Sequence, residues 1–125
     1  MIKMKVAVTA MAGDLDSAVD RVFGRAQCFL ISDSEGEKIE VIENVQNMNA
    51  AQGAGIQAAR QVADQKVDVL LTGNVGPNAF RALEAAGIKV YQFESDIATG
   101  RDALRAWKEG RLQEVKSPTA KGHGF

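Results

Sequence analysis

The sequence predicts an α/β protein, a three-layer α/β/α sandwich around a mixed five-stranded sheet with one antiparallel strand. Apolar runs typical of buried strands alternate with amphipathic helical patterns through the second half of the chain. In the first half, a short turn joins two strand-like runs, which predicts a hairpin and hence the antiparallel strand. With 125 residues, 46% of them apolar, we expect a single domain over residues 1–116 and a flexible tail over 117–125.

The first half of the chain predicts three strands. The first covers Met4–Thr9, and a connection rich in aspartate follows over Ala10–Gly24. Cys28–Ser32 predicts the second strand, and the polar turn Asp33–Glu37 leads to the third, Ile39–Val45. Apolar residues alternate with glutamates in the third strand, so we expect one of its faces to be in water.

A segment near the middle of the chain combines a strand, a glycine loop and a helix start. Val67–Thr72 is a short apolar run of the kind that forms buried parallel strands. The run breaks at Gly73–Gly76, and Pro77 suits the first turn of a helix. Gly87 predicts a left-handed end to that helix. Open α/β sheets bind ligands at such loops, where backbone N–H groups can face an anion.

Two further helices and one further strand complete the pattern. The loop Asn47–Gly55 leads into a helix that continues to about Lys66. Ile88–Phe93 predicts the fifth strand. Asp96 is a good N-cap for the last helix, and Gly110 lies just beyond its end.

Charge and cysteine content exclude several classes of protein. The formal net charge is −1, which gives no case for a nucleic-acid partner or an acidic membrane surface. Cys28 is the only cysteine, so no internal disulfide can form, as is usual in a reducing cytoplasm. The N-terminus lacks a signal-peptide pattern, and no apolar run approaches the ~20 residues of a membrane helix. We therefore expect a cytoplasmic protein.

Few residues are suited to catalysis. His123, the only histidine, lies in the glycine-flanked tail, and Cys28 lies in an apolar strand where a cysteine usually packs as a small hydrophobe. The spacing of Asp14, Asp16 and Asp20 does not match a calcium loop, and turn formation explains these residues better than a metal site does. A hydrolase that pairs these carboxylates stays an alternative, but we do not expect an enzyme.

Three stretches of the chain resemble the dinitrogenase iron–molybdenum cofactor biosynthesis family, the NifX-like nitrogenase accessory factors. They are Asp16–Ala26, Gly53–Ala59, and Gly73–Leu83 continued by Ala86–Tyr91, and they span most of residues 4–110. The resemblance implies a ribonuclease-H-like fold, which carries no activity by itself. It also implies a non-enzymatic protein that binds, carries or helps to assemble an anionic metal–sulfide cluster. The cluster is either of the iron–molybdenum type or a molybdenum–copper sulfide, as in the "orange protein" subgroup.

The resemblance and the loops together suggest where a cluster would bind. A polyanionic sulfide cluster needs N–H donors, cations and soft ligands. The expected cluster-binding residues are Arg25, Gly53, Gly55, Gly73, Asn74, Gly76 and Asn78, and the candidate metal ligands are Met11, Met48 and Cys28. Gln52 precedes Gly53, near the loops where nitrogenase-linked members often have a histidine or cysteine. This departure favours holding a preassembled cluster by charge and hydrogen bonds.

The expected partners are the metal–sulfur cluster and a protein that takes part in its assembly or delivery, with no organic cofactor. The alternative function is a phosphate- or nucleotide-binding module that uses the same loops. Gly73–Gly76 matches neither the phosphate-loop motif nor the dinucleotide motif, so the sequence gives this alternative only general support.

Overall fold

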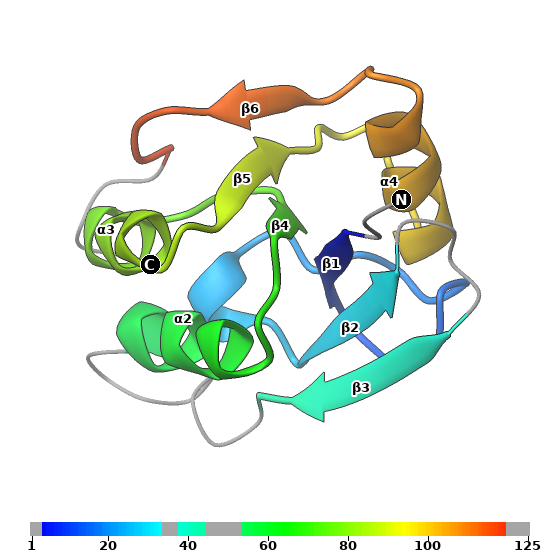
Figure 1. Ribbon diagram of the computed structural model, residues 1–125. Coiled ribbons are helices and arrows are strands. Elements are labelled where there is room, and N and C mark those ends of the chain that lie inside the picture. Colours follow the sequence, from blue (N-terminus) through cyan, green and yellow to red (C-terminus); the bar gives the residue numbers. More distant parts are fainter. Residues whose placement is uncertain (1–3, 34–37, 45–53, 120–125) are drawn as a thin grey trace.

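The computed structural model describes residues 4–33, 38–44 and 54–119 (Figure 1). The strands are β1 (Lys5–Ala10), β2 (Cys28–Asp33), β3 (Ile39–Glu43), β4 (Val69–Thr72), β5 (Lys89–Gln92) and β6 (Gln113–Val115). The α-helices are α2 (Ala54–Asp64), α3 (Pro77–Ala85) and α4 (Gly100–Lys108), and η1 (Phe23–Arg25) is a short 3-10 helix. The predicted order of elements is confirmed, with η1 and β6 added to it.

The sheet has six strands in the order β3-β2-β1-β4-β5-β6. The central strands β1, β4 and β5 are parallel, and β2 is antiparallel to both of its neighbours, which confirms the mixed sheet and the hairpin. The predicted count of five strands with one antiparallel strand was wrong, because β6 also pairs antiparallel with β5. Only Val115 of this short polar strand packs against the core, so no apolar run marks it in the sequence.

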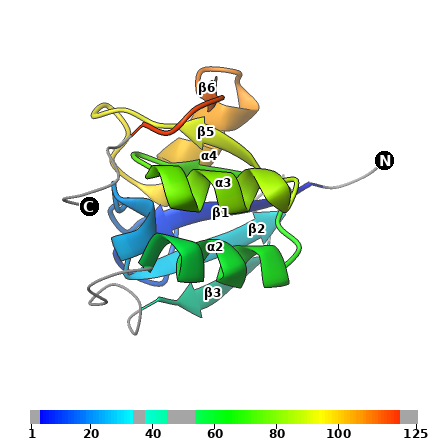
Figure 2. The same cartoon turned by 90° about the vertical axis from the view of Figure 1, so that its left-hand side faces the viewer.

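Helices cover both faces of the sheet. In Figures 1 and 2, α2 and α3 lie side by side over one face and α4 lies over the other. Successive strand residues point to opposite faces, so Leu70 joins the core under α2 and α3 while Leu71 joins the core under α4. All residues of β4 are buried, as expected of a parallel strand covered on both sides. The predicted three-layer sandwich is therefore confirmed.

β3 forms one edge of the sheet and differs from its prediction. Ile39 and Ile42 pack against different cores, on opposite faces of the sheet. The expectation of a single wet face was therefore wrong, because the two isoleucines are three residues apart and point to opposite sides. Val41 is 42% exposed, and Glu40 and Glu43 are exposed beside it.

The ends of two helices follow the predicted chemistry, but the start of α4 does not. Gly87 and Gly110 have φ values of 77° and 73°, the left-handed conformation that suits glycine at a helix end. The N-cap of α4 is Thr99 rather than the predicted Asp96, since the Asp102 N–H donates to Thr99 Oγ1 at 3.1 Å. Ile97, expected on the helix, is instead buried in the segment before it.

The C-terminal segment is partly ordered. Thr119 falls within the predicted flexible tail, yet its N–H and its hydroxyl are both hydrogen-bonded to the backbone of Val75. Residues 120–125 lie outside the described part of the chain, and the domain boundary at residue 116 stays a prediction. No helix in the described part is long and apolar enough to cross a membrane.

Thr99→Ala should destabilise the protein by about 1 kcal/mol, because it removes the hydroxyl that accepts the Asp102 N–H at the start of α4. Chemical denaturation measures the free energy of unfolding. Thr99→Ser should keep most of the stability, and Asp96→Ala should match the wild type. A larger loss for Asp96→Ala than for Thr99→Ala would contradict this assignment of the N-cap.

Candidate functional site

The candidate site lies at the edge of the sheet where the parallel strands β1, β4 and β5 end. Three features meet there: the loop of residues 73–76 between β4 and α3, the helix η1, and residue Thr119. The N–H of Phe23 in η1 donates to Asn74 O at 3.0 Å, and Val22 forms a parallel bridge with Asn74. The carboxyl edge of a parallel sheet is where open α/β folds bind ligands.

The carbonyl groups of residues 73–76 are all engaged by other parts of the protein. The donors come from β5, η1, the C-terminal segment and α3 in turn. They are Gln92 Nε2 to Gly73 O at 2.8 Å, Phe23 N to Asn74 O at 3.0 Å, Thr119 N to Val75 O at 3.0 Å, and Phe80 N to Gly76 O at 2.9 Å. Each acceptor of this loop thus has a partner within the fold.

Unlike these carbonyl groups, several backbone N–H groups at the start of α3 make no hydrogen bond within the described residues. Gly76 is the N-cap of α3 and offers no side chain to cap the helix. Within the described residues, the N–H groups of Gly76, Asn78 and Ala79 donate no hydrogen bond, and Pro77 has no N–H. Asn78 is exposed, whereas Ala79 is buried beside Gly55 of α2. With its carbonyls engaged and these donors unpaired, the start of α3 presents N–H groups and the positive end of a helix dipole.

The predicted glycines differ in why the fold needs them. A Cβ atom on Gly73 would lie 2.6 Å from Arg21 O, and one on Gly55 would lie 2.9 Å from Ala79 Cβ, so both are required by close packing. A Cβ atom on Gly76 would meet nothing within 4 Å. Only Gly76 of these three therefore borders open space. Gly53 lies outside the described residues.

The remaining predicted residues lie in the loop, in the first turn of α3, in η1 and just after β1, and they differ in exposure. Asn74 is half-buried in the loop and Asn78 is exposed in the first turn of α3. Arg25 is half-buried in η1, whose first residue is bonded to the loop. Met11 follows the carboxyl end of β1 and is 48% exposed. Met48, the other predicted sulfur ligand, lies outside the described residues.

Cys28 is buried, and its thiol is already engaged. The thiol has two carbonyl acceptors within hydrogen-bond distance of Cys28 Sγ, Ala12 O at 3.3 Å and Ala10 O at 3.5 Å. Burial raises the pKa of the Cys28 thiol, and the negative charges of Asp20 and Glu43 raise it further. Because metals bind the thiolate, this geometry favours the structural role that the sequence also favoured over a role as a metal ligand.

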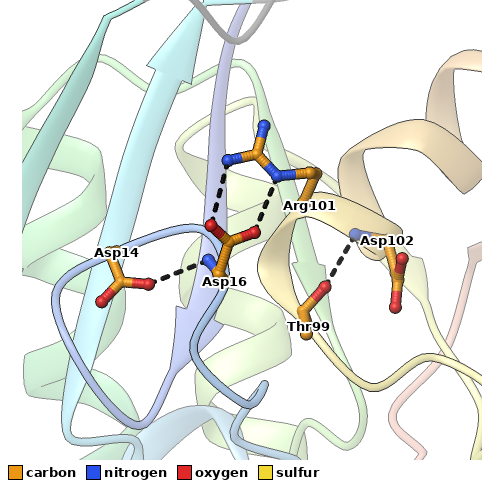
Figure 3. A network of polar contacts seen from close by, with 5 residues as sticks. All are labelled: Asp14, Asp16, Thr99, Arg101 and Asp102. Carbon is orange, nitrogen blue, oxygen red and sulfur yellow. Dashed lines mark hydrogen bonds and ion pairs between the residues drawn. The ribbon is translucent and has the colours of Figure 1, made fainter.

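Two aspartates of the first connection, Asp14 and Asp16, make a hydrogen bond and an ion pair within the fold (Figure 3). Asp14 accepts from the Asp16 N–H at 2.9 Å, and Asp16 pairs with Arg101 at 2.8 Å. This hydrogen bond and the charge of Arg101 lower the pKa of Asp16. Asp20 accepts from the Gln27 N–H, while its burial raises its pKa. No group of three potential metal-binding His, Cys, Asp or Glu residues occurs over 4–33, 38–44 and 54–119.

Sequence reasoning missed residues that hold the loop in place. Gln92 and Thr119 bind its carbonyls, and Arg21 donates to Glu94 O and Ile97 O, which ties the next loop to the same edge. Asn44 is fully buried and donates to Ala26 O at 2.8 Å, which fixes the end of η1. Only Asn44 carried a signal, as an amide side chain inside the expected third strand.

Comparison with known proteins assigns a family to this architecture. The model of the dinitrogenase iron-molybdenum cofactor family matches residues 4–110. The chain belongs to this family. Its structure is similar to that of the apo form of the orange protein from Desulfovibrio gigas, with 41% identity, a TM-score of 0.88, and coverage of 94% of this chain and 97% of that one.

Two further relatives cover nearly the whole chain. A Thermotoga protein with a provisional NifB assignment is 39% identical, with a TM-score of 0.81 and coverage of 94% of this chain and 97% of its own. An uncharacterized protein of Methanocaldococcus jannaschii is 27% identical over 119 residues, which is 93% of this chain and 98% of that protein. The suspected family is thus confirmed along the length of the domain.

Gly55→Ala should destabilise the protein by about 1–2 kcal/mol, because the new methyl would press against the Ala79 methyl where α2 and α3 touch. Unfolding in urea measures the loss. Ala79→Gly is the matching change on the other helix, and it removes the opposing methyl. The double variant should be more stable than the sum of the single losses predicts, and strict additivity would contradict direct contact.

Iodoacetamide should label Cys28 at pH 8 at least about ten times more slowly in the native protein than in guanidinium, because the native thiol is buried and stays protonated. Mass spectrometry follows the labelling. The native rate should rise only at a higher pH than in the unfolded chain, since the raised pKa delays thiolate formation. Equal native and unfolded rates would mean that the thiol is accessible.

Proposed function

We propose that this protein binds an anionic metal–sulfide cluster at the loop of residues 73–76 and the start of α3, and that it carries the cluster or helps to assemble it. The observation that carries the proposal is the asymmetry of this loop. Its carbonyl groups are engaged within the fold, whereas the N–H groups of Gly76, Asn78 and Ala79 have no acceptor among the described residues. A surface of donors without acceptors favours an anion over a cation.

The chemistry of the surrounding residues suits a preassembled cluster. Hydrogen bonds from backbone N–H groups stabilise the negative charge on sulfide, and the helix dipole adds to that stabilisation. Arg25 can supply a positive charge from η1, and the exposed thioether of Met11 is a soft ligand at the same edge. The cluster is held in this proposal by charge and hydrogen bonds more than by direct metal ligation.

The relatives support the same class of ligand. The family is described by the iron-molybdenum cofactor of dinitrogenase. The Desulfovibrio gigas relative is called the orange protein, and its structure is that of an apo form, the term for a protein without the group that it binds. The family description supports a molybdenum-containing cluster as the ligand. We propose that the cargo is an iron–molybdenum or molybdenum–copper sulfide and that the protein is a cytoplasmic carrier rather than an enzyme. Such a carrier requires a second protein that donates or receives the cluster.

The first test is reconstitution. We expect the wild-type protein to take up tetrathiomolybdate together with copper(I), or an iron–molybdenum–sulfur cluster, under anaerobic conditions, with a visible absorption band and metal retained after gel filtration. Inorganic phosphate and ATP are titrated in parallel and followed by the amide resonances of residues 74–79. Perturbation by phosphate or ATP without uptake of either sulfide would favour the phosphate- or nucleotide-binding alternative and overturn the proposal.

Gly76→Asp should reduce cluster uptake at least about tenfold without loss of stability. An N-cap aspartate accepts the N–H groups of the first helical turn, which stabilises α3 by a few tenths of a kcal/mol and occupies the donors that the cluster would use. Its charge also repels the anion. The position has room for the change, since a Cβ there meets nothing within 4 Å. Uptake is measured by the visible band and stability by thermal unfolding.

Two control variants separate the causes. Gly76→Asn caps the helix without adding charge and should weaken uptake less than Gly76→Asp does. Gln65→Glu adds the same negative charge just after the C-terminal end of α2, and this variant should leave cluster uptake unchanged. If Gly76→Asp folded normally and bound the cluster as well as the wild type, this loop would not be the binding site.

A further inference from the structure

We infer that Thr119 is a positioning residue for the anion site and that the C-terminal segment carrying it belongs to that site. The inference rests on the proposed function. It concerns a stretch of chain that follows the last strand and lies beyond the region matched by the family model, residues 4–110. Thr119 is 44 residues away in sequence from the loop residue that it holds.

Thr119 binds both backbone groups of Val75. The Val75 N–H donates to Thr119 Oγ1 at 2.8 Å, and the Thr119 N–H donates to Val75 O at 3.0 Å. The hydroxyl also lies 3.5 Å from Val75 O. The Val75 side chain is 1% exposed and packs in the core beneath α2 and α3. Val75 is therefore fixed from the core by its side chain and from the C-terminal segment by its backbone.

Because the peptide group is planar, fixing the Val75 carbonyl also fixes the direction of the Gly76 N–H. Val75 C=O and Gly76 N–H belong to one planar peptide group, which is trans, so they point in opposite directions. When the Thr119 N–H holds Val75 O, the Gly76 N–H must point away from Thr119. Thr119 thus sets the direction of a donor that it does not touch.

The hydrogen bonds between Thr119 and Val75 can also be strengthened by a bound ligand. β6 runs antiparallel to β5, and the chain after it bends back on itself (Figure 1) so that Thr119 reaches Val75 in the loop before α3. Lys116, Ser117 and Pro118 are exposed, so little apolar burial offsets the loss of chain entropy there. Two hydrogen bonds at the end of such a segment open readily. By linkage, an anion that requires an ordered Gly76 N–H stabilises the Thr119 contact in return.

The decisive variant is Thr119→Val, which keeps the shape of the side chain and removes the acceptor for the Val75 N–H. The Thr119 N–H can still donate to Val75 O, but one of the two hydrogen bonds that hold the segment on Val75 is lost. We expect its affinity for tetrathiomolybdate with copper(I) to fall about 3- to 10-fold, the equivalent of one hydrogen bond, and the visible band of the bound cluster to shift. Thr119→Ser restores the hydroxyl and should recover both the affinity and the wild-type spectrum. Ser117→Ala, which removes a hydroxyl two residues earlier, should change neither.

The controls distinguish this inference from the proposed function. If the wild type takes up no cluster, the proposed function fails and this inference fails with it. If the wild type binds and Thr119→Val binds equally well, only the inference is overturned. The inference is also overturned if Thr119→Ser does not restore the affinity, or if Ser117→Ala loses affinity to the same extent. In either case the effect would not depend on the Thr119 hydroxyl. Near-ultraviolet circular dichroism checks that each variant is folded.

A second readout uses linkage and needs no variant. Amide exchange of Val75, whose N–H donates to Thr119, is measured in the wild type with and without tetrathiomolybdate and copper(I). We expect exchange to slow at least about threefold when the cluster is bound. Bound cluster with unchanged exchange at Val75 would overturn the coupling.

Discussion

The candidate site depends on the way the protein engages the carbonyl groups of one loop. A glycine-containing loop after a buried strand has several conformations of similar energy, and only some of them present their N–H groups together. Here Gln92, Phe23 and Thr119 each donate to a successive carbonyl, and each comes from a different part of the chain. Because each trans peptide joins a carbonyl to the next N–H, fixing the acceptors fixes the donors. The arrangement forms without a ligand, and by linkage a bound anion would strengthen its Thr119 contact.

Much of the fold could be predicted, because the signals were local. The apolar run of β4 and the turn residues of the β2–β3 hairpin determine the central sheet. β6 could not be predicted because its pairing with β5 is a tertiary effect on a polar segment. The start of α4 was misplaced because Asp96 and Thr99 are both good N-caps, and only the packing of Ile97 decides between them.

The sequence predicts the position of the candidate site but not the role of each residue in it. The sequence identifies the loop of residues 73–76. It cannot distinguish a glycine that leaves room for a ligand from one that is required because a neighbouring backbone packs against it. Gly73 and Gly76 look alike in the sequence, but only the structure brings Arg21 O against Gly73 and leaves Gly76 in open space. Thr119 could not be assigned for a related reason, since its contact exists only after β6 has turned the chain back toward α3.

β3 has a consequence for how the protein behaves at high concentration. An outer strand exposes unpaired backbone groups that can extend the sheet into a second molecule. In β3 the exposed Val41 is accompanied by Glu40 and Glu43, which also lie at the surface. Two such strands brought together would set carboxylates of like charge near one another and bury them at a high desolvation cost. The same glutamates that make β3 a poor core strand therefore discourage fibrous aggregation.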